Sequence, residues 1–174
     1  DYAVKMRRFR QEQLLDGIAA RDGLDETLLR ALARELAEIH ARLPACYPDT
    51  RGSEPGTPAA LRAAMEQNFE QVWKYSIAQA QRQTLREVQD WSRQRFGELL
   101  PLMTQRVNEG MVIDGHGDAH LGNIALVDGA VRLFDCIEFN ANFRIMDSIS
   151  EFAFLDMDMV ARGYQQASRR LLTD

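Results

Sequence analysis

Residues 116–123 read HGDAHLGN, and residues 134–138 read FDCIE. Two β-prone runs lie between these stretches and are joined by Asp128-Gly129. An Asp-Gly pair between such runs is the strongest short-range signal for a β-hairpin. Because a hairpin returns the chain to the end from which it started, the sequence predicts that the loops before and after it lie close together.

The polar side chains in these two loops suit a magnesium and phosphate site. Mg²⁺ prefers oxygen ligands and keeps several waters, so the carbonyl of Asn123 and the carboxylate of Asp135 are a typical protein contribution when substrate phosphates supply the rest. Asp118 can then orient an acceptor hydroxyl and take its proton during phosphoryl transfer. We expect these three side chains to converge on one concave site at the base of the hairpin.

The order HGDxHxxN, hairpin, Asp resembles the catalytic and metal-binding segments of the aminoglycoside phosphotransferase and choline kinase group, distant relatives of protein kinases. Within that group, the chain looks most similar to an uncharacterised bacterial aminoglycoside phosphotransferase-like family. The likeness covers most of the chain and includes residues 2–9, 36–40, 91–96, 134–140 and 151–158.

The resemblance implies a role for each matching residue. Asp118 corresponds to the catalytic base, and His116 to the histidine that braces the catalytic loop. Asn123 and Asp135 correspond to the residues that bind Mg²⁺ and, through it, the nucleotide. Glu151 stands where relatives often carry Asp in the helix after the metal loop, so the resemblance assigns this carboxylate no definite role.

The fold that the resemblance implies is α+β and mainly α, the C-terminal lobe of a protein-kinase-like fold with a small catalytic β-hairpin. Residues 1–8 would form a hinge-like strand, 9–110 the helical part, 111–142 the catalytic and metal loops with the hairpin, and 143–174 the C-terminal helices. Kinase-like enzymes hold ATP with a Gly-rich hairpin and a strand lysine upstream of the hinge. None of the eleven glycines precedes Gly17. The nucleotide-binding N-terminal lobe is therefore expected to be missing, and the chain, which starts at Asp1 without Met, to be a piece of a longer protein.

Helical patterns flank the loops on both sides. Upstream, Asp25 and Thr57 mark the N-caps of two helices. A third pattern begins near Ala80 and meets Pro101, which predicts a kink or a restart. Downstream, apolar residues at helical spacing from Ile145 onward predict a single helix.

Composition excludes several functional classes. The 174 residues are 45% hydrophobic and 27% charged, as in an ordinary globular domain, and the net charge of −5 disfavours a general nucleic-acid binder. No apolar run approaches the roughly 18 residues of a membrane span and no signal stretch opens the chain, so we expect a cytoplasmic protein. Cys46 and Cys136 alone predict neither a disulfide framework nor a zinc site.

The function expected from these features is transfer of the γ-phosphate of ATP, or of GTP, to a hydroxyl of a small molecule. The expected partners are the nucleotide and this acceptor, with no nucleic-acid polymer and no membrane. This chain alone is expected to be inactive and to favour homodimer formation through residues 2–6, next to the missing lobe.

Two other functional classes stay open. Asp118 and His120 also fit the first ligand pair of a binuclear metallophosphoesterase, but that site needs further histidines, and none follows His120. A non-catalytic or degenerate kinase-like binding module would keep the fold without the chemistry.

The other polar residues have ordinary structural interpretations beside the functional ones. His120 is interpreted as a buried, hydrogen-bonded loop histidine rather than a metal ligand, and His40 as a favourable residue at a helix C-terminus. Glu138 fits two interpretations equally: a contact to the acceptor or a second metal ion, or a polar loop residue. The remaining carboxylates of the last long helix are interpreted as a solvated face: Asp147, Asp156 and Asp158.

Overall fold

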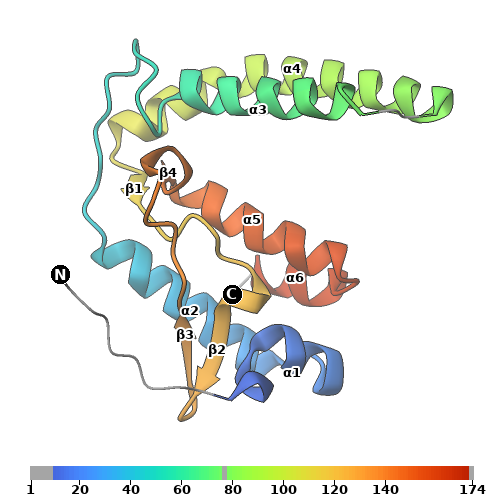
Figure 1. Ribbon diagram of the computed structural model, residues 1–174. Coiled ribbons are helices and arrows are strands. Elements are labelled where there is room, and N and C mark those ends of the chain that lie inside the picture. The colour runs from blue at the N-terminus through green and yellow to red at the C-terminus, as the bar shows by residue number, and fades with distance from the viewer. Residues whose placement is uncertain (1–9, 76–77, 173–174) are drawn as a thin grey trace. The chain divides into compact units, whose positions relative to one another are not determined.

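Helices dominate the computed structural model, and its strands are short (Figure 1). The structure describes residues 10–75 and 78–172. Among these residues the strands form two antiparallel two-stranded sheets. The predicted class, α+β and mainly α, is confirmed at this level. The hinge-like strand expected at residues 1–8, and the dimer contact expected at 2–6, lie outside the described residues.

The chain divides into two units. The first comprises residues 115–139, 148–172 and the described part of 1–43, and the second comprises residues 44–114 and 140–147. The helical part expected over 9–110 is thus shared between the units. The elements of the first unit are η1 (Gln11–Gln13), α1 (Leu15–Asp22), α2 (Glu26–Arg42), η2 (Leu121–Asn123), β2 (Ile124–Val127), β3 (Ala130–Leu133), α5 (Ser148–Ala161) and α6 (Gln165–Leu171).

The predicted hairpin forms as expected. β2 pairs with β3 so that Ile124 faces Leu133 and Val127 faces Ala130. Asp128 and Gly129 connect them with φ values of 51° and 80°. Two consecutive positive φ values define the type I′ turn that matches the twist of paired strands, which is why Asp-Gly is favoured there.

A single apolar core holds the first unit together. α1 packs against β2, and α2 packs against β3 and α6 (Figure 1). Asp25 caps α2 by accepting a hydrogen bond from the Leu28 N–H (2.7 Å), as predicted. The core side chains share complete or nearly complete burial: Leu15, Ala19, Leu29, Leu32, Leu36, Leu121, Ile124, Val131, Leu155, Met159 and Leu171.

The second unit contains a pair of long helices and a small sheet. Thr57 caps its first helix by accepting a hydrogen bond from the Ala60 N–H (3.2 Å), as predicted. Pro101 lies inside the second long helix and does not end it, so the predicted restart is wrong. The elements of this unit are α3 (Pro58–Trp73), α4 (Gln79–Asn108), β1 (Val112–Asp114), η3 (Ala141–Phe143) and β4 (Ile145–Asp147).

The predicted helix from Ile145 is wrong in its first three residues. β4 pairs antiparallel with β1, with Ile145 opposite Asp114, and α5 begins only at Ser148. Two bonds from Arg106 to the carboxylate of Asp147 (2.6 and 2.8 Å) anchor the end of β4. This long-range pairing overrides a periodicity that fits a helix equally well.

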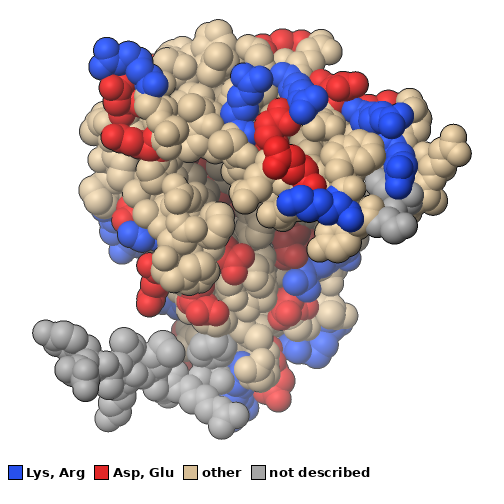
Figure 2. All heavy atoms as spheres, turned by 45° about the horizontal axis from the view of Figure 1, so that its top comes forward, with Lys and Arg blue, Asp and Glu red and all other residues tan. Residues whose placement is uncertain are grey.

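Charges of both signs are mixed on the surface. On the face that Figure 2 presents, Lys and Arg side chains lie beside Asp and Glu side chains, and neither sign covers a broad area of the described residues. The bidentate pair between Arg93 and Glu66 (2.7 and 2.8 Å) is one example. Within the described residues, no helix is both long and apolar enough to cross a membrane.

Candidate functional site

Asp118 and Asn123 are in direct contact in the first unit. The side-chain amide of Asn123 donates hydrogen bonds to the carboxylate Oδ2 of Asp118 (3.0 Å) and to its backbone carbonyl (3.1 Å). Asn123 is 8% exposed, whereas Asp118 is partly exposed. Because the nitrogen of the amide points to Asp118, its oxygen is left to accept from, or coordinate, another group.

His116 connects the loop before the hairpin to the loop after it. Its buried ring places Nε2 2.7 Å from the carbonyl oxygen of Phe134, and Nδ1 accepts a hydrogen bond from the backbone N–H of Asp118 (3.3 Å). Because a carbonyl can only accept and a backbone N–H can only donate, this geometry assigns the donor role to Nε2 and the acceptor role to Nδ1. His116 thus bonds to both loops, and the bracing role that the resemblance implies stays a prediction.

Asp135 is brought to the site through its backbone neighbours. The N–H of Phe134 donates to the carbonyl of Asn123 (3.1 Å), and the N–H of Ile137 donates to the carbonyl of His116 (2.9 Å). Between these two bonds, Asp135 has φ 61° and an exposed side chain. A non-glycine residue in this left-handed region is uncommon and concentrates at functional sites.

The sequence predicts that Asp118, Asn123 and Asp135 converge, and the structure bears on this in two ways. The side chains of Asp118 and Asn123 meet, and the backbones on either side of Asp135 are bonded to the same loop. The Asp135 side chain itself is exposed, and its convergence with the other two side chains stays a prediction. Glu138 is exposed in the same segment, and its predicted contact to the acceptor or a second metal ion stays a prediction.

The buried carboxylate of Glu151 anchors the loop that precedes Asp118, which the sequence did not predict. Glu151 is 2% exposed, and its Oε1 accepts from the backbone N–H groups of His116 and Gly117 (2.9 Å to Gly117). Its Oε2 accepts from Nε2 of His40 (2.6 Å). His40 lies in the last turn of α2, as predicted, but also has this specific partner.

Burial and hydrogen bonding act in opposite directions on Glu151. Burial raises the pKa of the Glu151 carboxyl, because it penalises the charged form. The hydrogen bond from His40, the N–H of Gly117, the charge of His40 and the N–H of His116 outweigh burial and hold this pKa below its ordinary value. The side chain is therefore an ionised carboxylate in the interior.

Glycine is required where this carboxylate meets the loop. A Cβ on Gly115 would lie 2.9 Å from Oε1 of Glu151, closer than a carbon and an oxygen can pack. Gly117 has φ 80°, which L side chains rarely adopt. The two glycines around His116 are thus explained by close approach and backbone conformation.

A second carboxylate of α5 contacts the same loop. Oδ2 of Asp158 accepts from the N–H of Leu121 (3.0 Å), and its Oδ1 accepts from Nε of Arg162 (2.8 Å). The side chain of Asp158 is only 18% exposed. The predicted solvated face is wrong for this residue. It is also wrong for Asp147, which binds Arg106, and for Asp156, which accepts from the hydroxyl of Ser168.

His120 is a hydrogen-bonded loop residue, as predicted, but the predicted burial is wrong, because its side chain is 29% exposed. Its Nδ1 accepts from the N–H of Gly122 (3.0 Å), and its Nε2 lies 3.7 Å from Oδ2 of Asp118. In the described residues, no three His, Cys, Asp or Glu side chains are grouped as a metal site. The amide oxygen of Asn123 and the carboxylate of Asp135 are nonetheless the hard oxygen donors that Mg²⁺ accepts in small numbers, so the residue types fit this ion.

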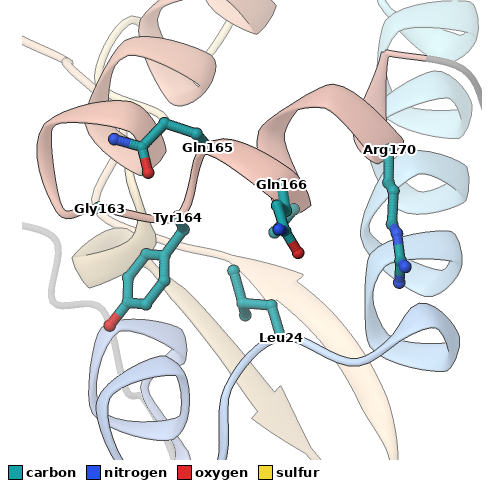
Figure 3. A pocket seen from close by; sticks show the side chains of 7 residues that line it. Leu24, Gly163, Tyr164, Gln165, Gln166 and Arg170 are labelled. Atoms are coloured by element: carbon teal, nitrogen blue, oxygen red, sulfur yellow. The ribbon is translucent and has the colours of Figure 1, made fainter.

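A separate cavity of about 350 Å³ lies in the first unit (Figure 3). It is bordered by Leu24 and by the start of α6, with the side chains of Tyr164 and Arg170 at its margin. It contains none of the site residues predicted from the sequence.

Comparison with known proteins finds relatives that have no assigned activity. Uncharacterized proteins from two strains of Mycobacterium tuberculosis and from Mycobacterium bovis are 32% identical to this chain over 162 residues. The match covers 92% of this chain but 32% of each relative, so the chain spans about a third of the length of the curated relatives it matches. No family model and no solved structure matches the chain.

Proposed function

We propose that the first unit is the phosphoryl-transfer core of a kinase-like phosphotransferase, corresponding to the C-terminal lobe of that fold. The reaction would move the γ-phosphate of ATP or GTP to a hydroxyl of a small molecule. The contact of Asn123 with Asp118, at the base of a hairpin that leads to Asp135, carries this proposal. It combines a base, an amide oxygen and a second carboxylate, which are the groups that this transfer requires of the protein.

Asp118 is the base in this proposal. Its Oδ2 is occupied by the amide of Asn123, while Oδ1 accepts no hydrogen bond from a described residue. Oδ1 is therefore the atom assigned to the acceptor hydroxyl. The hydroxyl oxygen bonds to the γ-phosphorus, the bond from phosphorus to the β–γ bridging oxygen breaks, and the hydroxyl proton passes to Asp118 as the nucleoside diphosphate leaves.

Asn123 and Asp135 would hold Mg²⁺, which when bound neutralises charge on the transferred phosphate. For Asn123, the bond from its amide nitrogen to Asp118 leaves the oxygen on the other side for the ion. For Asp135, the two backbone bonds that flank it hold its backbone next to the same loop. Phosphoryl transfer depends on this kind of positioning, because the protein itself supplies little covalent chemistry.

The full-length protein allows a direct test. We expect Mg²⁺-dependent transfer from ATP to at least one member of a panel of amino alcohols, sugars and amino sugars, followed by ³¹P NMR. The same protein should bind Mn²⁺·ATP, measured by electron paramagnetic resonance. Binding without transfer would favour the non-catalytic module. The absence of both binding and transfer would contradict both functions.

A further inference from the structure

Asp158 makes a contact that an ordinary surface carboxylate does not make. Its Oδ2 accepts from the backbone N–H of Leu121 (3.0 Å), the first residue of η2, and η2 ends at Asn123. Asp158 follows Glu151 by seven residues, or about two helical turns, so both side chains lie on the same face of α5. Glu151 holds the loop before Asp118, and Asp158 holds it after Asp118.

The bond to Leu121 determines the position of Asn123. The N–H of Leu121 opens a short 3₁₀ turn that closes with the N–H of Asn123 on the carbonyl of His120 (2.9 Å). The Leu121 side chain is completely buried, so the turn is held by its apolar contact on one side and by a charge-assisted hydrogen bond on the other. A shift of this turn would move the amide of Asn123 and, through it, the carboxylate of Asp118.

Arg162 fixes the orientation of Asp158. Its Nε donates to Oδ1 (2.8 Å), which leaves Oδ2 directed at Leu121. The guanidinium also lies 4.0 Å from the carboxylate of Asp16 on α1. The carboxylate of Asp158 is therefore held by a partner on each oxygen.

We infer that Asp158 is a positioning residue for the metal and base side chains, acting through the turn that carries Asn123. This inference rests on the proposed function, and it adds a residue that does not touch the substrates. Loss of the Leu121 bond should weaken the hold on the nucleotide-bound metal ion and slow transfer, because Asn123 and Asp118 are coupled by their own hydrogen bond.

The test compares three variants on the same helix in the full-length protein. Asp158→Asn leaves one neutral oxygen, which can accept from either the Leu121 N–H or Nε of Arg162 but not from both, and Asp158→Ala removes both bonds. Asp156→Asn is the matched control, because Asp156 is two residues away and its partner is the hydroxyl of Ser168. The readouts are hydrogen exchange of peptides spanning 116–124, Mn²⁺·ATP affinity by paramagnetic resonance, and kcat.

We expect exchange of the Leu121 amide to accelerate about tenfold in Asp158→Ala and less in Asp158→Asn. Mn²⁺·ATP affinity and kcat should each fall by about three- to tenfold, while Asp156→Asn leaves all three readouts near wild type. Asp158→Asn decides the question if the alanine variant does not fold.

Two outcomes would overturn the inference alone. One is exchange over 116–124 that matches the Asp156→Asn control, and the other is faster exchange with unchanged Mn²⁺·ATP affinity and kcat, which would make Asp158 purely structural. A wild-type protein that neither binds Mn²⁺·ATP nor transfers phosphate would remove the proposed function and this inference together.

Discussion

Glu151 is a charged side chain in the interior of the first unit, and its hydrogen bonds decide whether it is tolerated there. An unpaired buried carboxylate is strongly destabilising. For Glu151, the hydrogen bonds from His40, His116 and Gly117 offset the free-energy cost of burying the charge. The same bonds fix the backbone that leads into Asp118. Stability and site geometry thus depend on one residue.

Stability should depend on pH through Glu151. Its folded-state pKa is held below the unfolded value, which is about 4.3, so its contribution is fully present above that value and is lost as pH falls through the folded pKa. Glu151→Gln should lower the free energy of unfolding by about 1–3 kcal/mol at pH 7. The difference from wild type should narrow below about pH 4.3.

Urea unfolding between pH 3 and pH 7 measures this difference. Glu38→Gln is the matched control, since Glu38 is an exposed carboxylate on α2 and its change should alter stability by less than about 0.5 kcal/mol. A Glu151→Gln variant as stable as Glu38→Gln at pH 7 would contradict the anchoring role.

Changes at Asp118 and Asp135 should separate catalysis from metal binding. Asp118→Asn keeps the size of the side chain but removes the base, so kcat of the full-length protein should fall by about 10²–10⁴ with nucleotide affinity near wild type. Asp135→Ala should instead remove the Mg²⁺ dependence of nucleotide binding. Steady-state kinetics and calorimetry distinguish the two effects, and normal turnover by both variants would rule out the kinase assignment.

At the scale of elements, local signals were sufficient for the hairpin but not for its surroundings. Asp128-Gly129 specifies a turn through backbone conformation alone, so it could be predicted without knowledge of the rest of the chain. β4 could not, because Ile145 fits a helical stripe until it meets its partner strand 31 residues earlier, at Asp114.

The contacts of the site also divide into those that local sequence predicts and those that only the fold reveals. Asp118, Asn123 and Asp135 lie in sequence around a hairpin, so their proximity could be predicted from its topology. His40 and Glu151 are 111 residues apart, and nothing in the sequence around either residue indicates that it needs a distant partner. Only the fold of the first unit, in which α2 and α5 both pack against α6, reveals that His40 and Glu151 bind each other.

Two Gly→Ala changes should have opposite effects on stability. Gly97 lies within α4, where a Cβ meets open space, so Gly97→Ala should stabilise by about 0.5–1 kcal/mol. Gly129 also meets open space, but its φ is 80°, so Gly129→Ala should destabilise by about 1–2 kcal/mol. Urea unfolding of both variants is the measurement, and changes of equal sign would show that backbone conformation does not control the turn.

At the scale of the whole molecule, folding and activity should be separable. The first unit has its own apolar core, to which α1, α2, the hairpin, α5 and α6 all contribute. No glycine precedes Gly17, so residues 1–16 contain no Gly-rich segment. This chain spans about a third of the length of its curated relatives. We therefore expect the proposed phosphoryl transfer to need groups from outside this chain.

We expect the 174-residue chain alone to fold and to show no measurable transfer from ATP, because the proposed Asn123 and Asp135 contacts leave the γ-phosphate without its positioning groups. Cooperative thermal unfolding, followed by circular dichroism, establishes the folded state. The full-length protein, assayed beside it with the same acceptor panel, should transfer phosphate in an Mg²⁺-dependent reaction. Equal turnover by the short chain would mean that it contains a complete nucleotide site, and the groups that hold the γ-phosphate would then have to be sought among its own residues.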